Sequence, residues 1–263
     1  LSLGGAALIS TRAAAPLAGV LAAWVWLDAY WPRMTGKARL AAWFGLAALG
    51  ALMVAFSWGW LRTAGGWDAL LTLRNSGWVD KLFKEVLGER LILPFVVGYG
   101  LAQPVLPAAI FESTIPLWRG IAVARALGWY LLAPLLVYAL FAVWRAEPKE
   151  NRRWLFLLTA AGLVWLLLSS FRAGGDLWDN PRYRTIFIVF LAALAGWALD
   201  HALARRDVWL WRWVGVEVVF IGFFGAWYAA RYDRWMVPMP FTSMIAWIVG
   251  LSLALIAGGW GWD

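Results

Sequence analysis

Cysteine is absent from the 263-residue chain, and histidine occurs only once, at position 201. Without cysteine there is no disulfide framework and no thiol chemistry. A single histidine cannot build the usual protein ligand sets of zinc or haem sites. Charge is also scarce, because 14% of the residues are charged against about a quarter in soluble domains. We therefore expect no metal and no cofactor, and a fold that is not that of a soluble domain.

Apolar residues are abundant instead. They make up 63% of the chain, the mean hydropathy is +0.69, and runs of about 18 or more recur, which is the length of a membrane-spanning helix. The sequence predicts an all-α, polytopic integral membrane protein. The net charge of +8 fits loops that face lipid headgroups, so membrane lipids are expected partners and nucleic acid is not.

We expect about seven membrane-spanning helices and a partial helix over residues 1–10, all in one transmembrane domain that covers residues 1–263. A segment of about 61–118 is inserted at the outer face and contains an amphipathic helix over 78–87. Because the chain begins Leu-Ser-Leu-Gly-Gly rather than with Met, we expect it to start inside a longer protein. The spans are predicted at 13–31, 40–60, 119–143, 154–171, 183–199, 209–229 and 242–260.

One further apolar stretch, 91–111, is interrupted by Pro94, Pro104 and Pro107, which favours a broken or re-entrant segment. If this stretch does not cross the membrane, the short basic loops at 33–39, 145–153 and 205–206 all lie on one side. The positive-inside rule makes that side cytoplasmic. We favour this topology over the one in which 91–111 crosses.

The charged stretch "GGDLWDNPRYR", 174–184, stands between two apolar runs. A charged residue at the centre of an inserted helix costs about 2.5–3.5 kcal/mol, so the stretch is expected in an outer-face loop or a water-filled cavity. Asp179 or Asn180 is predicted to cap a helix that begins near Arg182. Arg182 and Arg184, beside the positive end of that helix, would suit a phosphate. Alternatively, the Asp and Arg side chains pair with each other at an ordinary helix start.

Other polar residues are weaker candidates. Arg12 is predicted on the same outer face, where it either binds an anion or anchors a helix by snorkelling. Gln103, with Tyr99, could offer hydrogen bonds to a sugar, or it could mark a helix kink without a ligand. Asp200 and His201 are interpreted as a solvated helix end.

Two stretches resemble a known family. "GGAALISTRAAAPLAGVLAAWVWL", followed by a basic turn, a second span and "SWGWLRTAGGWDALL", is similar to the middle of the polytopic GT-C glycosyltransferases of the protein mannosyltransferase and lipid A aminoarabinose transferase type. These enzymes have Thr-Lys or Ser-Arg at the matching helix junction. "DNPRYRTIFIVFLAALAGWAL" resembles their later Arg-Tyr segment. Together the landmarks cover residues 1 to about 200.

The resemblance implies a sugar transfer from a polyprenyl-phosphate-linked donor at the outer face of a bacterial plasma membrane. Arg12 would bind the lipid phosphate, and Arg182 and Tyr183 match the later motif. The catalytic Asp of such enzymes lies in a first outer loop that would precede this chain. Asp176 and Asp179 are therefore weaker candidates for the base.

Two other functions remain open. The chain could be a non-catalytic membrane scaffold that binds protein subunits, which would also explain the incomplete catalytic set. An oligosaccharide polymerase or ligase would use similar lipid donors with a different helix order. A transporter is disfavoured because almost no charge falls within the spans.

Overall fold

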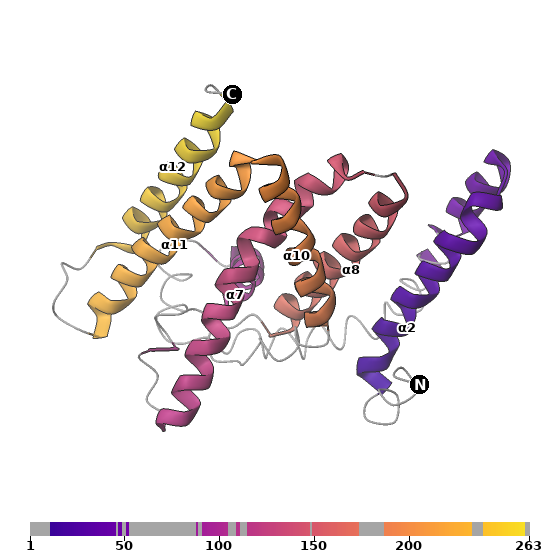
Figure 1. Cartoon of the computed structure of the whole chain (residues 1–263). Helices are drawn as coiled ribbons and strands as arrows, with labels where there is room; N and C mark the ends of the chain where they lie inside the picture. Colours follow the sequence, from indigo (N-terminus) through magenta and orange to yellow (C-terminus); the bar gives the residue numbers. More distant parts are fainter. Residues whose placement is uncertain are drawn as a thin grey trace. The chain divides into compact units, whose positions relative to one another are not determined.

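A computed structural model shows a helical protein (Figure 1). All regular secondary structure in the described part of the chain is helical. The predicted all-α class is therefore confirmed there. The described residues are 11–45, 47–48, 51–52, 88, 91–104, 109–110, 115–147, 149–173, 187–232 and 239–260.

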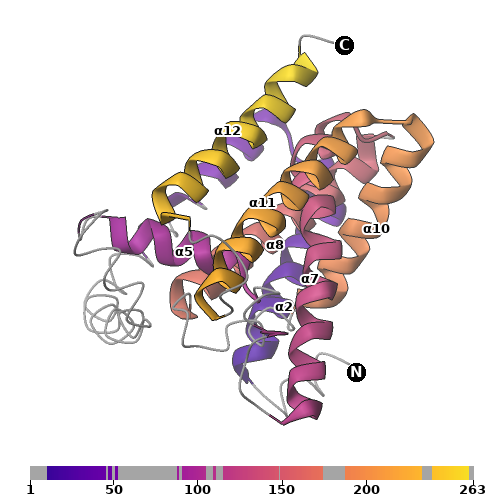
Figure 2. The same cartoon turned by 90° about the vertical axis from the view of Figure 1, so that its left-hand side faces the viewer.

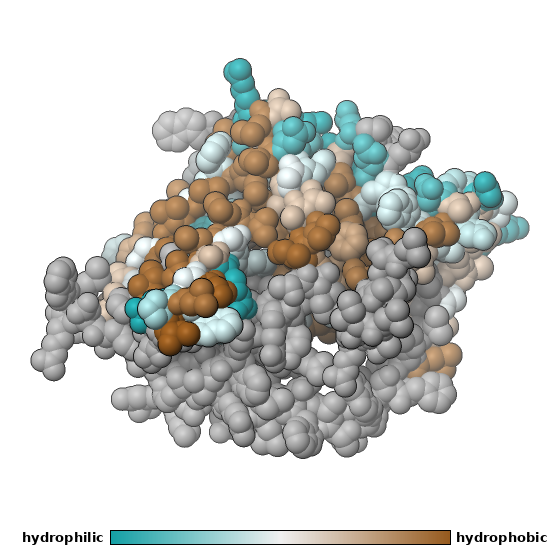
Figure 3. Space-filling view, turned by 60° about the horizontal axis from the view of Figure 1, so that its bottom comes forward, coloured by the Kyte–Doolittle hydropathy of each residue, from teal (hydrophilic) through white to brown (hydrophobic). Residues whose placement is uncertain are grey.

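Among the described residues, five helices are long and apolar enough to cross a membrane. In the view of Figure 3 the described helices present mainly apolar side chains. Since about 20 helical residues match the thickness of a hydrocarbon core, the chain is an integral membrane protein. The helices are α7 (Pro116–Ala142), α8 (Lys149–Ala173), α10 (Ile188–Arg205), α11 (Val208–Tyr232) and α12 (Phe241–Trp260).

These five helices correspond to five of the predicted spans, with one shift in position. The span predicted at 183–199 is α10, which extends from Ile188 to Arg205 with Phe187 as its N-cap. The predicted helix start near Arg182, with Asp179 or Asn180 as its cap, lies outside the described residues. Asp200 and His201 lie in the last turns of α10, which continues to Arg205, so the predicted end of this helix is too early. Asp200 is exposed, as expected for a solvated helix end, whereas His201 is partly buried.

The other predicted spans are described in part. The first corresponds to α2 (Thr11–Val25), continued by the π-helical turn η1 (Trp26–Tyr30) and the 3-10 turn η2 (Trp31–Arg33). Most of the second, at 40–60, lies outside the described residues, as do 1–10 and the amphipathic helix at 78–87. A count of about seven spans stays a prediction.

The proline-broken stretch contains one short helix, α5 (Ile92–Ala102). It has 11 residues, which corresponds to a length of about 16 Å, or half of a hydrocarbon core. The peptide bond between Gln103 and Pro104, directly after α5, is cis. That 91–111 does not cross the membrane stays a prediction.

The chain forms two compact units, and each unit combines two separate stretches of sequence. Unit 1 comprises Leu1–Leu101 and Glu147–Trp178, and unit 2 comprises Ala102–Ala146 and Asp179–Asp263. In unit 1, α2 packs against α8. The rings of Trp24 and Trp154 meet edge to face there, with their centroids 4.6 Å apart.

Unit 2 is a helical bundle in which α10 and α11 pack on α7 and α12 packs on α11 (Figures 1 and 2). Many of its buried side chains are small, which lets helix axes approach closely in a membrane. Pro134 lies buried inside α7. The buried residues of α7 and α10 include Ala126, Leu136, Tyr138, Ala139, Ala142, Leu191, Leu194, Ala195, Ala198 and Ala202.

Candidate functional site

Three spans of unit 2 have one of their two termini at the same end of the bundle. The span of α7 ends at Arg145 and that of α10 at Arg205, whereas the span of α11 begins at Val208. Only Arg206 and Asp207 connect α10 to α11. In Figure 1 this turn and the C-terminal end of α7 lie at the same end of the bundle. The three span ends therefore meet at one membrane face.

The turn between α10 and α11 is closed by backbone hydrogen bonds. Arg206 adopts the left-handed conformation, with φ 51° and ψ 40°, and its N–H donates to the carbonyls of Ala202 and Leu203. The N–H of Asp207 donates to the Ala202 carbonyl at 2.9 Å. Glycine is the usual residue at such a helix end, because a side chain opposes positive φ.

Asp207 starts the next helix and also joins it to α7. One carboxylate oxygen, Oδ1, accepts the backbone N–H of Trp209 at 3.0 Å, as an N-cap does. The other, Oδ2, accepts the Tyr138 hydroxyl at 2.8 Å and Nη2 of Arg145 at 2.8 Å. We call Tyr138, Arg145 and Asp207 the Asp207 cluster. It connects the ends of α7, α10 and α11.

The Asp207 cluster is buried on its tyrosine side and open on its arginine side. Tyr138 has no exposed surface, and the Asp207 side chain is 8% exposed whereas that of Arg145 is 45% exposed. Burial alone would raise the pKa of Asp207. Hydrogen bonds from Tyr138 and from the Trp209 N–H, together with the charge of Arg145, lower that pKa below its ordinary 3.8. Asp207 is therefore an ionised acceptor.

Asp207 should make the free energy of unfolding of the protein depend on pH in the acidic range. Because its pKa is lowered on folding, its contribution is fully present above the ordinary value of 3.8 and is lost as the pH falls through the lower folded pKa. Unfolding in mixed micelles, measured from neutral pH to well below the ordinary pKa of 3.8, should show a steeper loss of stability below that value for the wild type than for Asp207→Asn. Parallel profiles for the two proteins would contradict this assignment.

Two contacts of aromatic rings occur near the cluster, one on α10 and one on α11. The His201 ring lies against Trp197 with the centroids 5.0 Å apart, and its Nε2 is buried without a hydrogen-bond partner among the described residues. The Arg212 guanidinium lies 4.6 Å from the centre of the Trp209 ring, a cation–π distance. His201 is thus part of the packed helix end.

The Asp207 cluster is suited to a structural role, that of holding helix ends together, rather than to catalysis. Its carboxylate accepts three hydrogen bonds and has a lowered pKa, so it is a poor proton acceptor. Within the ranges that the structure describes, no group of three or more His, Asp or Glu side chains could hold a metal ion. We assign the cluster to holding three helix ends together.

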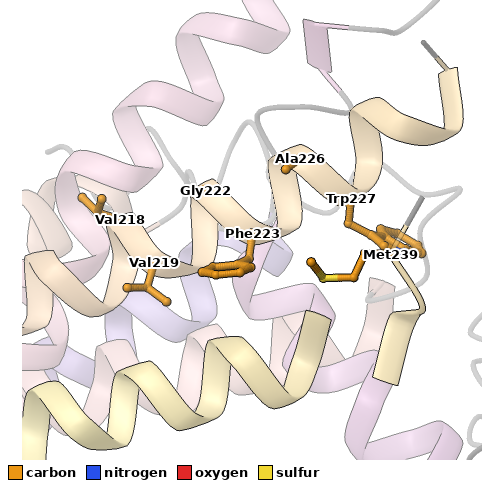
Figure 4. Close-up of a pocket in the computed structure, with 7 residues that line it drawn as sticks. All are labelled: Val218, Val219, Gly222, Phe223, Ala226, Trp227 and Met239. Carbon is orange, nitrogen blue, oxygen red and sulfur yellow. The ribbon is translucent and has the colours of Figure 1, made fainter. Parts of the chain in front are cut away.

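Unit 2 also contains an apolar cavity of about 280 Å³ along the second half of α11. In Figure 4, Val219 and Phe223 point toward the side on which α12 runs, and the Phe223 ring stacks on that of Trp247 of α12. The lining offers little to catalysis, because it is mainly apolar. It consists of Val218, Val219, Gly222, Phe223, Ala226, Trp227 and Met239.

The predicted site residues are described only in part. Arg12 lies in α2 of unit 1, and its side chain is outside the description. Gln103 is buried, 6% exposed, after the end of α5. The remaining candidates lie outside the described residues and are Asp176, Asp179, Asn180, Arg182, Tyr183 and Arg184.

The Asp207 cluster was missed by reasoning from the sequence. In the sequence, Arg145 is one of several charges in the basic loop at 145–153, and no local pattern marks Tyr138 or Asp207. One signal was available: Tyr138 is a polar group deep in an apolar run, and Asp207 is an acid directly after two arginines. Buried hydroxyls need partners, but the sequence does not say which partner.

No family model, no curated protein and no solved structure matches the chain. The class that the fold defines is a polytopic α-helical membrane protein.

Proposed function

We propose that the chain is part of a membrane glycosyltransferase that moves a sugar from a polyprenyl-phosphate-linked donor to an acceptor at the outer face of a bacterial plasma membrane. The observation that carries the proposal is the pair of cationic motifs, Thr11-Arg12 and Asn180 to Arg184. Thr11-Arg12 begins the apolar helix α2, and the later motif precedes the apolar helix α10. The two motifs occur in the order that the resemblance to GT-C enzymes requires.

The positions of the spans support a loop around the later motif. Arg182 falls between the consecutive spans Asn151–Ser170 and Ile188–Arg205, and a chain that leaves one span and enters the next does so at one membrane face. Charged residues avoid the hydrocarbon there. This supports Arg182, Tyr183 and Arg184 as groups available to a lipid headgroup.

In the proposed reaction, the acceptor oxygen loses its proton to a base and attacks the anomeric carbon of the donor sugar. The bond between that carbon and the phosphate oxygen breaks, and its electron pair leaves with the lipid phosphate. Arg12 and Arg182 would bind this phosphate through charge-assisted hydrogen bonds. Those bonds strengthen as negative charge grows on the leaving group, which lowers the barrier.

The other candidate residues have smaller parts in this proposal. The resemblance assigns the base to an Asp of the first outer loop of such enzymes, and Asp176 and Asp179 are the weaker candidates within residues 1–263. Asn180 and Gln103 would donate hydrogen bonds to the phosphate or the sugar. None of these roles needs a metal.

Donor binding tests the proposal directly. The full chain is placed in nanodiscs, and its affinity for a polyprenyl-phosphate sugar is measured for Arg12→Ala, Arg182→Ala and the double variant. Since a hydrogen bond to a charged group contributes about 1.5–3 kcal/mol, each single change should weaken binding about tenfold or more. Lysine at either position should restore part of the affinity.

The matched control is Arg33→Ala, an arginine of the opposite predicted face, which should leave the affinity unchanged. A polyprenol without phosphate should bind weakly to every protein. Donor binding that survives the double variant, or a wild type that binds no donor, would overturn the proposal. The second result would favour a scaffold.

A further inference from the structure

A separate cationic surface lies at the C-terminal end of α10. It comprises the exposed arginines at the three span ends, with the exposed tryptophans beside them; we call it the basic turn surface. Because α10 crosses from Ile188 to Arg205, this surface lies on the opposite membrane face from the proposed donor site. Its residues are Trp144, Arg145, Arg205, Arg206 and Trp211.

The arginines of this surface have N–H donors that are not used by Asp207. The Nη2 of Arg145 is used by Asp207, but a guanidinium has five N–H donors, and nearly half of this side chain is exposed. Arg205 and Arg206 are exposed, and no described carboxylate forms an ion pair with either. The three arginines lie beside one buried carboxylate, that of Asp207, and the exposed acids near these span ends are Glu147 and Asp200.

These arginines are close to each other in space. Nη2 of Arg145 lies 2.8 Å from Oδ2 of Asp207, although 62 positions of sequence separate the two residues. Arg205 and Arg206 directly precede Asp207 in the turn. Asp207 accepts Arg145 and so positions its guanidinium at this turn, where an anion could meet several arginines together.

The backbone of Arg206 is a second, independent observation. At φ 51° a residue with a side chain is held in a conformation that costs about 1 kcal/mol or more, which glycine avoids. An arginine therefore stands at a helix end where glycine is the usual residue. At this position the turn projects a guanidinium beyond the end of the span.

The tryptophans indicate where this surface lies relative to lipid. The side chains of Trp144 and Trp211 are 65% and 62% exposed, and both flank span ends. Tryptophan prefers the headgroup level of a membrane, so the guanidinium groups lie at the depth of lipid phosphates. The positive-inside rule assigns this face to the cytoplasm, whose leaflet carries anionic lipids.

We propose that the basic turn surface binds the phosphate of an anionic phospholipid, with Arg145, Arg205 and Arg206 as its ligands and Asp207 as a positioning residue. Inorganic phosphate has the same chemistry, but it has no apolar chains to lie beside the exposed tryptophans. The inference does not depend on the proposed glycosyltransferase activity, because it uses residues at the opposite ends of the spans.

Lipid selection in nanodiscs tests the inference on the full chain. Phosphatidylglycerol and phosphatidylcholine are supplied in equal amounts, and the lipids retained on the protein are counted by native mass spectrometry. The wild type should retain phosphatidylglycerol preferentially. Each arginine near an anionic surface contributes about 1 kcal/mol, so Arg205→Ala and Arg206→Ala should each reduce the preference about fivefold.

Two variants separate binding from folding. Arg206→Gly removes the charge and suits the left-handed turn, so the protein should stay folded yet select phosphatidylglycerol less. Arg119→Ala, at the opposite end of α7, removes an exposed arginine about 39 Å along the helix from Arg145, and should leave the selection unchanged.

Three outcomes would overturn the inference. These are equal retention of both lipids by the wild type, an unchanged preference in Arg206→Gly, and full displacement of phosphatidylglycerol by inorganic phosphate. Donor binding measured on Arg206→Gly should equal that of the wild type, which keeps the two proposals distinguishable.

Discussion

Replacing Asp207 by alanine is expected to lower the free energy of unfolding by about 3 kcal/mol, the largest loss of stability that we predict here. The substitution removes the N-cap of α11 and the acceptor of both Tyr138 and Arg145. Tyr138 is fully buried, so its hydroxyl would lose its partner away from water. The measurement is unfolding by SDS titration in mixed micelles.

A matched control separates this effect from the loss of a charge. Asp200 is an exposed acid of the same helix end, and Asp200→Ala should change the free energy of unfolding little. Tyr138→Phe should cost about 1.5 kcal/mol, and combining it with Asp207→Ala should cost less than the sum, because both remove the same hydrogen bond. Additive losses, or equal losses in Asp200→Ala and Asp207→Ala, would show that the cluster does not anchor these helices.

Enlarging Ala198 should produce the second-largest loss. Ala198 lies in the middle of α10 with no exposed surface, on the helix that packs against α7. A leucine there has no room, so it would force the two helices apart and lower the free energy of unfolding by about 2 kcal/mol. The loss is measured by the same SDS titration.

Ala193 provides the control for that substitution. It lies on α10 five residues before Ala198, but it is exposed, so Ala193→Leu adds the same atoms on a face that does not pack. Its free energy of unfolding should stay within about 0.5 kcal/mol of the wild type. If the two leucine variants are equally stable, close packing of α7 and α10 is not what holds unit 2 together.

The membrane class and most of the described spans could be predicted because they depend on local composition. The apolar runs of α7, α8, α11 and α12 are visible in the sequence alone, since insertion into a bilayer responds to the hydropathy of each segment by itself. The error at α10 has the same origin. Asp200 and His201 look like the last residues of a helix when only polarity is counted, but the helix continues to Arg205. The His201 ring packs on Trp197, one turn earlier in the same helix.

The candidate sites divide along the same line. Arg12, Asp176 and Arg182 could be predicted as candidates because charge is rare beside apolar runs, and a single sequence shows such charge directly. Tyr138 and Asp207 could not be predicted, because their role depends on a hydrogen bond between residues 69 positions apart. No local pattern predicts which of several polar residues a buried hydroxyl will meet.

By itself, the amino-acid sequence determined that this is a helical membrane protein without cysteine chemistry, and where most of its described apolar helices cross. Only the tertiary structure decided that the Asp207 carboxylate joins the start of α11 to the end of α7, and that it brings Arg145 beside Arg205 and Arg206. Hydropathy acts on each segment separately, whereas the pairing of helices depends on side-chain shape and on hydrogen bonds between residues that are distant in the chain.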